Sequence, residues 1–134
     1  MHHIPSELRY TATHEWVRLE NNNEVVIGMT HHAQRLLRDM VFVELPEVGR
    51  VLIEGDDAAV VESVKTAIDV FTPVSGEVLA VNEELEGAPE QINDDPYGAG
   101  WLFRLKLTGP DELDGLMAAD EYLELVRNEL AEQG

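Results

Sequence analysis

The eleven residues from Val60 to Val70 constrain the fold of this chain more than any other stretch. Two apolar arms flank a polar centre at Lys65, and a second turn signal follows at Pro73–Gly76. This pattern predicts a strand, a tight turn and a second strand, with the amine of Lys65 held out at the turn. The only other lysine is Lys106, so a lysine at this turn is a specific feature.

Composition indicates a folded, acidic protein without thiol chemistry. The chain has 134 residues, 44% of them hydrophobic. These values predict a single domain that spans residues 1–134 and buries a hydrophobic core. Twenty-seven acidic side chains against nine basic ones give a formal charge of −18. That charge argues against nucleic acid and anionic membranes, because both are bound mainly through Lys and Arg. There is no cysteine, so disulfides, thiolate metal sites and cysteine nucleophiles are excluded.

No targeting or membrane segment is visible. No apolar run approaches the length that crosses a bilayer. Residues 1–5 show neither the apolar region of a signal peptide nor an Arg/Ser-rich transit segment. We therefore expect a cytoplasmic protein.

Alternation of apolar and polar residues predicts a mainly β fold, a flattened sandwich or barrel with short helices at its margins. Residues 10–19 and 25–29 indicate a hairpin around an Asn-rich turn. Thr30 is placed to cap a short helix over residues 31–40. Further apolar runs predict strands at residues 41–45, 51–53, 78–82 and 101–107.

The second half of the chain contains a long irregular segment and two helical ones. Residues 83–100 carry several Gly and Pro residues and are predicted as a loop, either functional or packed by its own side chains. Pro110 and the acids after it predict a helix start at residues 108–113. We expect a C-terminal helix docked on the sheets through one apolar stripe. The stripe consists of Tyr122, Leu123, Val126 and Leu130.

Two short segments on opposite sides of Lys65 are weakly similar to each other. Gly49–Val51 and Gly76–Val78 each open an apolar strand. Two quasi-equivalent sheets, with the lysine hairpin at one end, would produce this spacing.

Lys65 is better suited to modification than to catalysis. A catalytic amine needs a depressed pKa, from burial or a neighbouring cation, whereas the neighbours here include the carboxylates Glu62 and Asp69. An exposed lysine at a hairpin tip instead suits recognition by a modifying enzyme and acylation to an amide. An ordinary solvated turn lysine is the alternative for the residue taken alone.

The surrounding residues resemble the attachment motif of biotinyl/lipoyl carrier domains. Biotin carriers have methionines beside the lysine, whereas Val64 and Thr66 stand here, so the resemblance favours lipoate on Lys65 over biotin. The matching residues are Gly49, Glu62–Ala67 and Pro73–Val78.

From about Leu8 to Tyr122 the sequence resembles the glycine cleavage H-protein family. The resemblance implies a hammerhead-type lipoyl-carrier sandwich with an N-terminal hairpin and C-terminal helices. The further matching segments are Thr13–Trp16, Gly28–Thr30, Ala33–Gln34, Val41–Gly49, Asn93, Pro96–Tyr97, Gly100–Trp101 and Pro110–Leu113.

This resemblance implies a carrier with no active site of its own. Lipoate on Lys65 would take up the aminomethyl group of glycine from a pyridoxal-phosphate glycine decarboxylase. An aminomethyltransferase would pass the one-carbon unit to tetrahydrofolate, and dihydrolipoyl dehydrogenase would reoxidise the arm. A lipoylating enzyme must load the lysine. A protein that visits several partners in turn is expected to be a monomer.

The loaded arm needs protection from water, because an aminomethyl thioether hydrolyses. A surface cleft with carboxylates or hydroxyls would suit its cationic amine, and the resemblance points to Thr13, Glu15 and Asp69 as the lining. Glu62 would orient the lysine for the lipoylating enzyme or a partner. Solvated strand carboxylates are the alternative for Glu15, Asp69 and Glu62.

Two alternatives to the glycine cleavage carrier stay open from the residues. One is a lipoyl or biotinyl domain of another multienzyme complex or lipoate relay. The other is an acidic interaction protein whose lysine is never modified. No metal site is expected, because His31 and His32 are adjacent and would point about 100° apart on a helix, with no carboxylate at ligand spacing.

Overall fold

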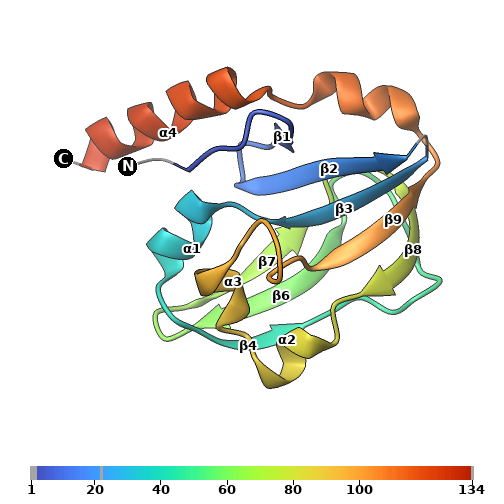
Figure 1. Ribbon diagram of the computed structural model, residues 1–134, viewed down its shortest axis with the longest axis horizontal. Helices are drawn as coiled ribbons and strands as arrows, with labels where there is room; N and C mark the ends of the chain where they lie inside the picture. Colours follow the sequence, from blue (N-terminus) through green and yellow to red (C-terminus); the bar gives the residue numbers. More distant parts are fainter. Residues whose placement is uncertain (1–2, 22, 134) are drawn as a thin grey trace.

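The computed structural model describes residues 3–21 and 23–133. In these residues the strands form two antiparallel sheets (Figure 1), with the orders β1-β2-β3-β9-β8-β5 and β4-β6-β7. The expected mainly β sandwich is confirmed. The larger sheet contains β1 (Arg9–Tyr10), β2 (Glu15–Asn21), β3 (Glu24–Met29), β5 (Val51–Leu52), β8 (Gly76–Val81) and β9 (Phe103–Leu107). The smaller contains β4 (Met40–Glu44), β6 (Asp57–Ser63) and β7 (Ala67–Phe71).

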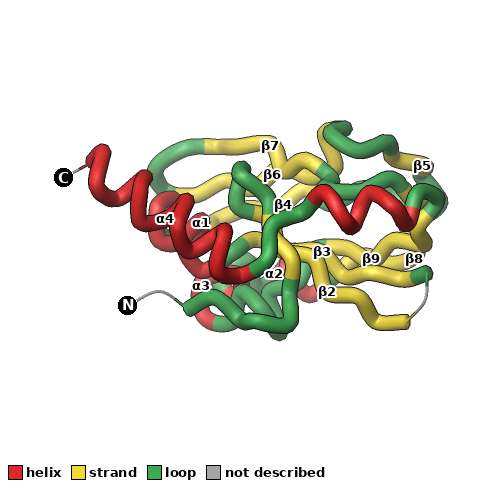
Figure 2. The backbone as a smooth tube through the Cα atoms, turned by 90° about the horizontal axis from the view of Figure 1, so that it is seen from above, coloured by secondary structure: helices red, strands yellow, loops and turns green. Residues whose placement is uncertain are grey.

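The two sheets pack face to face over one core. Figure 2 shows β6 and β7 on one side of the molecule and β2, β3 and β9 on the other. Buried and more exposed residues alternate along β9, as the period of two requires. β3 is buried on both faces instead, because Val26 packs with Trp16 in a second cluster under α4. Buried side chains from both sheets belong to the same hydrophobic cluster, among them Ile27, Leu105, Val61 and Val70.

The predicted helix after Thr30 is present but shorter than expected. Thr30 caps α1 (His31–Leu37) by accepting a hydrogen bond from the Ala33 N–H. The helix ends because Arg38 has a positive φ of 73°, and its N–H closes on the Gln34 carbonyl. β4 then begins at Met40, so the helix predicted over residues 31–40 extends three residues too far.

The first predicted strand is interrupted. Residues 11–14 form a turn between β1 and β2, in which the Thr11 N–H donates to the Glu15 carbonyl and the His14 N–H to the Thr11 carbonyl. His14 has φ 74°, an uncommon conformation for a residue with a side chain. This turn determines the direction of the Thr11 and Thr13 side chains, which contact Glu15 in the cleft described below.

Residues 83–100 are less irregular than predicted. They contain α2 (Glu84–Gly87) and α3 (Gln91–Asp94). Leu85 and Ile92, one on each helix, are fully buried in the main core. The segment is therefore packed by its own side chains, which was one of the two expectations for it.

The C-terminal helices are present and dock on one edge of the larger sheet. η1 (Pro110–Gly115) is a 3-10 helix that begins with the predicted proline, and α4 (Ala119–Gln133) lies over β1 (Figure 1). Tyr122 stacks on Tyr10, with ring centroids 4.6 Å apart, and Val126 is fully buried. The predicted stripe is wrong at Leu130, which is 40% exposed, whereas Glu129 beside it faces His14 and His32.

The expectation of two quasi-equivalent sheets is wrong. The two similar segments contribute β5 and β8. These strands pair with each other in the larger sheet, with Val51 opposite Glu77. The sheets contain six and three strands. None of the helices in the described ranges is both long and apolar enough to cross a membrane.

Candidate functional site

Lys65 lies at the tip of the β6–β7 hairpin, on a turn with a well-defined backbone. The Ser63 N–H donates to the Thr66 carbonyl at 2.8 Å. The Ser63 hydroxyl accepts from the N–H groups of Lys65 at 3.1 Å and Thr66 at 3.2 Å. Ser63 is buried while Lys65 is exposed. The turn is therefore fixed from inside and presents the lysine side chain outward.

The end of α1 and the residues that follow it support this tip. The Val64 N–H donates to the Asp39 carbonyl at 2.9 Å. The Lys65 amine has one long contact, 3.4 Å, to the Leu36 carbonyl, which restrains the side chain little. Val64 is 66% exposed, so an apolar side chain stands beside the lysine on the surface.

A cleft of about 390 Å³ lies at the other end of β7. A volume of this size accommodates a small ligand. Thr13 lines it from the turn before β2 and Glu15 from the first position of β2, while Phe71 ends β7 and Thr72 follows it. Its remaining lining residues are Thr11, Glu54, Gly55, Pro73, Glu112, Gly115 and Leu116.

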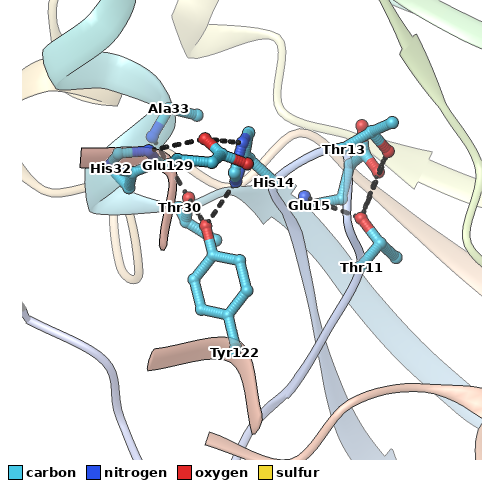
Figure 3. A network of polar contacts seen from close by, with 9 residues as sticks. All are labelled: Thr11, Thr13, His14, Glu15, Thr30, His32, Ala33, Tyr122 and Glu129. Atoms are coloured by element: carbon cyan, nitrogen blue, oxygen red, sulfur yellow. Dashed lines mark hydrogen bonds and ion pairs between the residues drawn. The ribbon is translucent and has the colours of Figure 1, made fainter. Parts of the chain in front are cut away.

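Glu15 is the buried carboxylate of this cleft. Its Oε1 accepts hydrogen bonds from the hydroxyls of Thr11 and Thr13, both at 2.6 Å (Figure 3). Burial raises the pKa of Glu15 above its usual value, and these hydrogen bonds oppose the rise. A carboxylate held by two hydroxyls at the wall of a cleft can bind a small cation or a hydrogen-bond donor.

Glu62 and Asp69 lie elsewhere. Both are exposed on the outer face of the smaller sheet, where Glu62 pairs with Ala67 near the tip and Asp69 with Val60. Asp69 lines a second hollow, of about 480 Å³, together with residues of β4 and β6. The structure thus brings Thr13 and Glu15 together, places Glu62 near Lys65, and leaves Asp69 outside the cleft that holds Glu15.

Sequence reasoning missed part of the cleft. Thr11 contacts Glu15 as closely as Thr13 does, and a signal for it existed, since residues 11, 13 and 15 alternate. Thr72 and Glu112 could not be found in this way, because tertiary packing brings them there from far along the chain.

A second polar cluster forms on the opposite side of the same turn. His14 and Glu15 are adjacent but point apart (Figure 3). His14 contacts Tyr122 through Nδ1 at 2.8 Å and Glu129 through Nε2 at 3.1 Å. His32 Nε2 lies 3.1 Å from the same Glu129 oxygen. Burial lowers the pKa of His14, against the attraction of the Glu129 carboxylate.

The family follows from comparison with known proteins. A family model described as glycine cleavage H-protein matches residues 8–129. This chain belongs to the glycine cleavage H-protein family. A glycine cleavage system H protein from Aeromonas hydrophila is 62% identical over 129 residues, covering 96% of this chain and all of the relative. Another from Neisseria gonorrhoeae is 57% identical and covers 89% of this chain and 90% of the relative.

A solved structure supports the same assignment. The crystal structure of a glycine cleavage system H protein from Mycobacterium marinum superposes with a TM-score of 0.80 at 40% identity, covering 89% of this chain and 95% of that one. As a member of the glycine cleavage H-protein family, the chain is the lipoyl carrier component of the glycine cleavage system. The resemblance found in the sequence is confirmed.

Proposed function

We propose that Lys65 is the residue that carries lipoate, as an amide on its side-chain amine. The observation that supports this most directly is the contrast at the hairpin tip. The backbone around Lys65 is held by the Ser63 hydroxyl, while the amine is exposed with one long contact. A rigid turn with a free amine suits a modifying enzyme that must recognise a shape and reach a nitrogen.

Lys65 fits lipoate in its chemistry as well as its position. The chain has no cysteine, so the sulfur chemistry of glycine cleavage must come from an attached group. Lipoate supplies a disulfide that is reduced as it accepts the aminomethyl group of glycine. We propose glycine decarboxylase, aminomethyltransferase, dihydrolipoyl dehydrogenase and a lipoylating enzyme as the partners, with no reaction centre on this chain.

Glu15 is proposed to receive the cationic cargo. β7, with five residues, separates the tip from the cleft and spans roughly 17 Å at about 3.3 Å per residue. A fully extended lipoyl-lysine reaches roughly 12–15 Å by ordinary covalent geometry, slightly less than this span, so the loaded end would meet the near edge of the cleft, at Phe71, before it meets Glu15. There Thr11 and Thr13 offer two hydroxyls beside the carboxylate of Glu15, which is only 4% exposed, so that water has little access to it.

Asp69 and Glu62 have other proposed roles. Asp69 lies two residues before Phe71 on the outer face of β7, on the route between the tip and the cleft. Glu62 lies near the tip, where a partner or the lipoylating enzyme would contact it. The monomeric state, the cytoplasmic location and the organisation of residues 1–134 as one domain stay predictions from the sequence.

Exchange of glycine with bicarbonate, catalysed by a glycine decarboxylase, tests the proposal. Lipoylated wild-type protein is expected to support exchange, and Lys65→Arg, which keeps the charge but cannot form the amide, is expected to lose it by more than about 100-fold. Lys106→Arg on β9 is the matched control and should exchange normally. Fully lipoylated protein that gives no exchange would defeat the glycine cleavage role and favour another multienzyme complex or a lipoate relay.

A further inference from the structure

We propose that His14, His32 and Glu129 form a binding site for one divalent transition-metal ion of the zinc class. They come from three separate segments: the turn before β2, the first turn of α1, and the last part of α4. This site is not predictable from the sequence, because Glu129 lies 97 residues from its nearer histidine and only the packing of α4 brings it close.

The ligand atoms are already gathered. Each residue offers one atom, and the three atoms lie within 4.8 Å of one another. Both Nε2 atoms lie 3.1 Å from the same Glu129 oxygen. Zinc bonds of about 2.0–2.2 Å place neighbouring tetrahedral ligands roughly 3.3 Å apart, so small side-chain movements complete the geometry.

The ligand set matches zinc-class ions. Two imidazole nitrogens and one carboxylate oxygen are ligands typical of zinc, and three protein ligands leave a fourth position for water. The side chains of His14 and His32 are 14% and 9% exposed, while Glu129 is 30% exposed. The histidines are therefore held in the protein, and an ion would enter from the Glu129 side.

Neighbouring groups orient the first histidine. His14 Nδ1 contacts the Tyr122 hydroxyl at 2.8 Å, and that hydroxyl contacts the Thr30 hydroxyl at 2.7 Å (Figure 3). This series of hydrogen-bonded groups can place the proton on Nδ1 of His14 and leave Nε2 free to coordinate an ion, as the outer contacts of metal-bound histidines commonly do. The positive φ of His14, 74°, is a further sign that the surrounding structure fixes the ring in place.

An ion bound here would join α4 to α1 and to the start of β2. These elements already meet through Tyr122 and Glu129. Binding to the folded state alone would therefore stabilise the fold and fasten the C-terminal helix.

Titration of metal-stripped protein with zinc chloride, followed by calorimetry and thermal unfolding, tests the site. The wild type is expected to bind one Zn²⁺ per chain, and Tm should rise by about 10 °C at 100 times Kd, with no rise in magnesium chloride. His32→Gln and Glu129→Gln should each weaken binding by at least about 100-fold. Tyr122→Phe removes the hydroxyl that contacts His14 Nδ1 and Thr30 but removes no ligand, so it should weaken binding by about 10-fold.

A double variant, His3→Ala with His31→Ala, is the matched control. These histidines lie near each other, with ring centroids 6.3 Å apart, but outside the proposed site, so zinc binding should be unchanged. Glu129→Gln keeps an oxygen that accepts hydrogen bonds, and circular dichroism checks its fold. Absence of saturable one-site binding in the wild type, or equal loss in the double control and His32→Gln, would overturn the proposal.

Discussion

At the scale of single residues, Glu15 is the buried carboxylate that is proposed to bind the cargo in the cleft. Its carboxylate is buried, and two threonine hydroxyls orient one of its oxygens. Buried groups of this kind bind a cation strongly because water competes little with them. Thr11 and Thr13 thus act by fixing the position of the carboxylate.

Replacing Glu15 with Ala should shorten the life of the aminomethyl group on the loaded carrier. A charge-assisted hydrogen bond contributes about 1.5–3 kcal/mol, so loss of the carboxylate should speed hydrolysis by about tenfold or more. The measurement is the release of formaldehyde and ammonia from loaded protein over time. Glu77→Ala, an exposed glutamate on β8, is the control, and an unchanged rate in Glu15→Ala would remove Glu15 from the proposed lining.

Gly28 is fixed by a contact with an aromatic ring. It lies opposite Trp16 in the β2–β3 pair, and a Cβ at this position would come within 2.6 Å of the indole. Trp16 is held in turn by a hydrogen bond from its indole N–H to the Pro96 carbonyl, so it cannot move away at low cost.

Gly28→Ala should therefore lower the free energy of unfolding by about 1–3 kcal/mol through overpacking. Urea denaturation followed by tryptophan fluorescence measures the change. Gly87→Ala is the matched control, because its Cβ would meet no atom within 4 Å, and its stability should change by less than about 0.5 kcal/mol. Equal stability of both variants would show that the Trp16 contact does not constrain this position.

At the scale of elements, α4 is anchored by few residues. Tyr122 and Val126 are fully buried against the sheet edge, whereas Leu130, one turn further on, is 40% exposed. The docking of the helix thus depends on its first half, while Glu129 adds polar contacts to the two histidines.

Val126→Ala should cost about 2 kcal/mol of stability, since it removes two buried methyl groups and leaves a cavity. Leu130→Ala, on the same helix, should change stability by less than about 0.5 kcal/mol. Thermal unfolding of the two variants provides the comparison. A larger effect at Leu130 than at Val126 would contradict the packing described for α4.

At the scale of the whole molecule, the sequence predicted the strands and the lysine hairpin well, because their periodicity is local. Thr30 was also predictable as a cap from its position before an apolar helix. The end of α1 was not, because Arg38 adopts a positive φ that its side chain does not favour. The unequal sheets were also missed, because strand pairing such as that of β5 with β8 depends on contacts distant in sequence.

The candidate site was likewise predictable where it depends on local sequence, and not where it depends on contacts distant in sequence. Lys65 and its turn were predictable, since Ser63 to Thr66 form a local hydrogen-bonded unit. The lining of the cleft was predictable only at Thr13 and Glu15, which lie on the turn before β2 and at the start of β2. Asp69 lies outside that cleft, and the His14–Glu129 contact depends on the docking of α4.

The fold as a whole holds Lys65 at one end of the smaller sheet and Glu15 at the other end of β7. Intact-mass and peptide-mass spectrometry of protein made in cells with a lipoylating enzyme tests the attachment itself. The wild type is predicted to gain the mass of one lipoyl amide, located on Lys65, and Lys65→Arg to gain none. A wild type that stays unmodified, or a lipoyl group that persists in Lys65→Arg, would contradict the account.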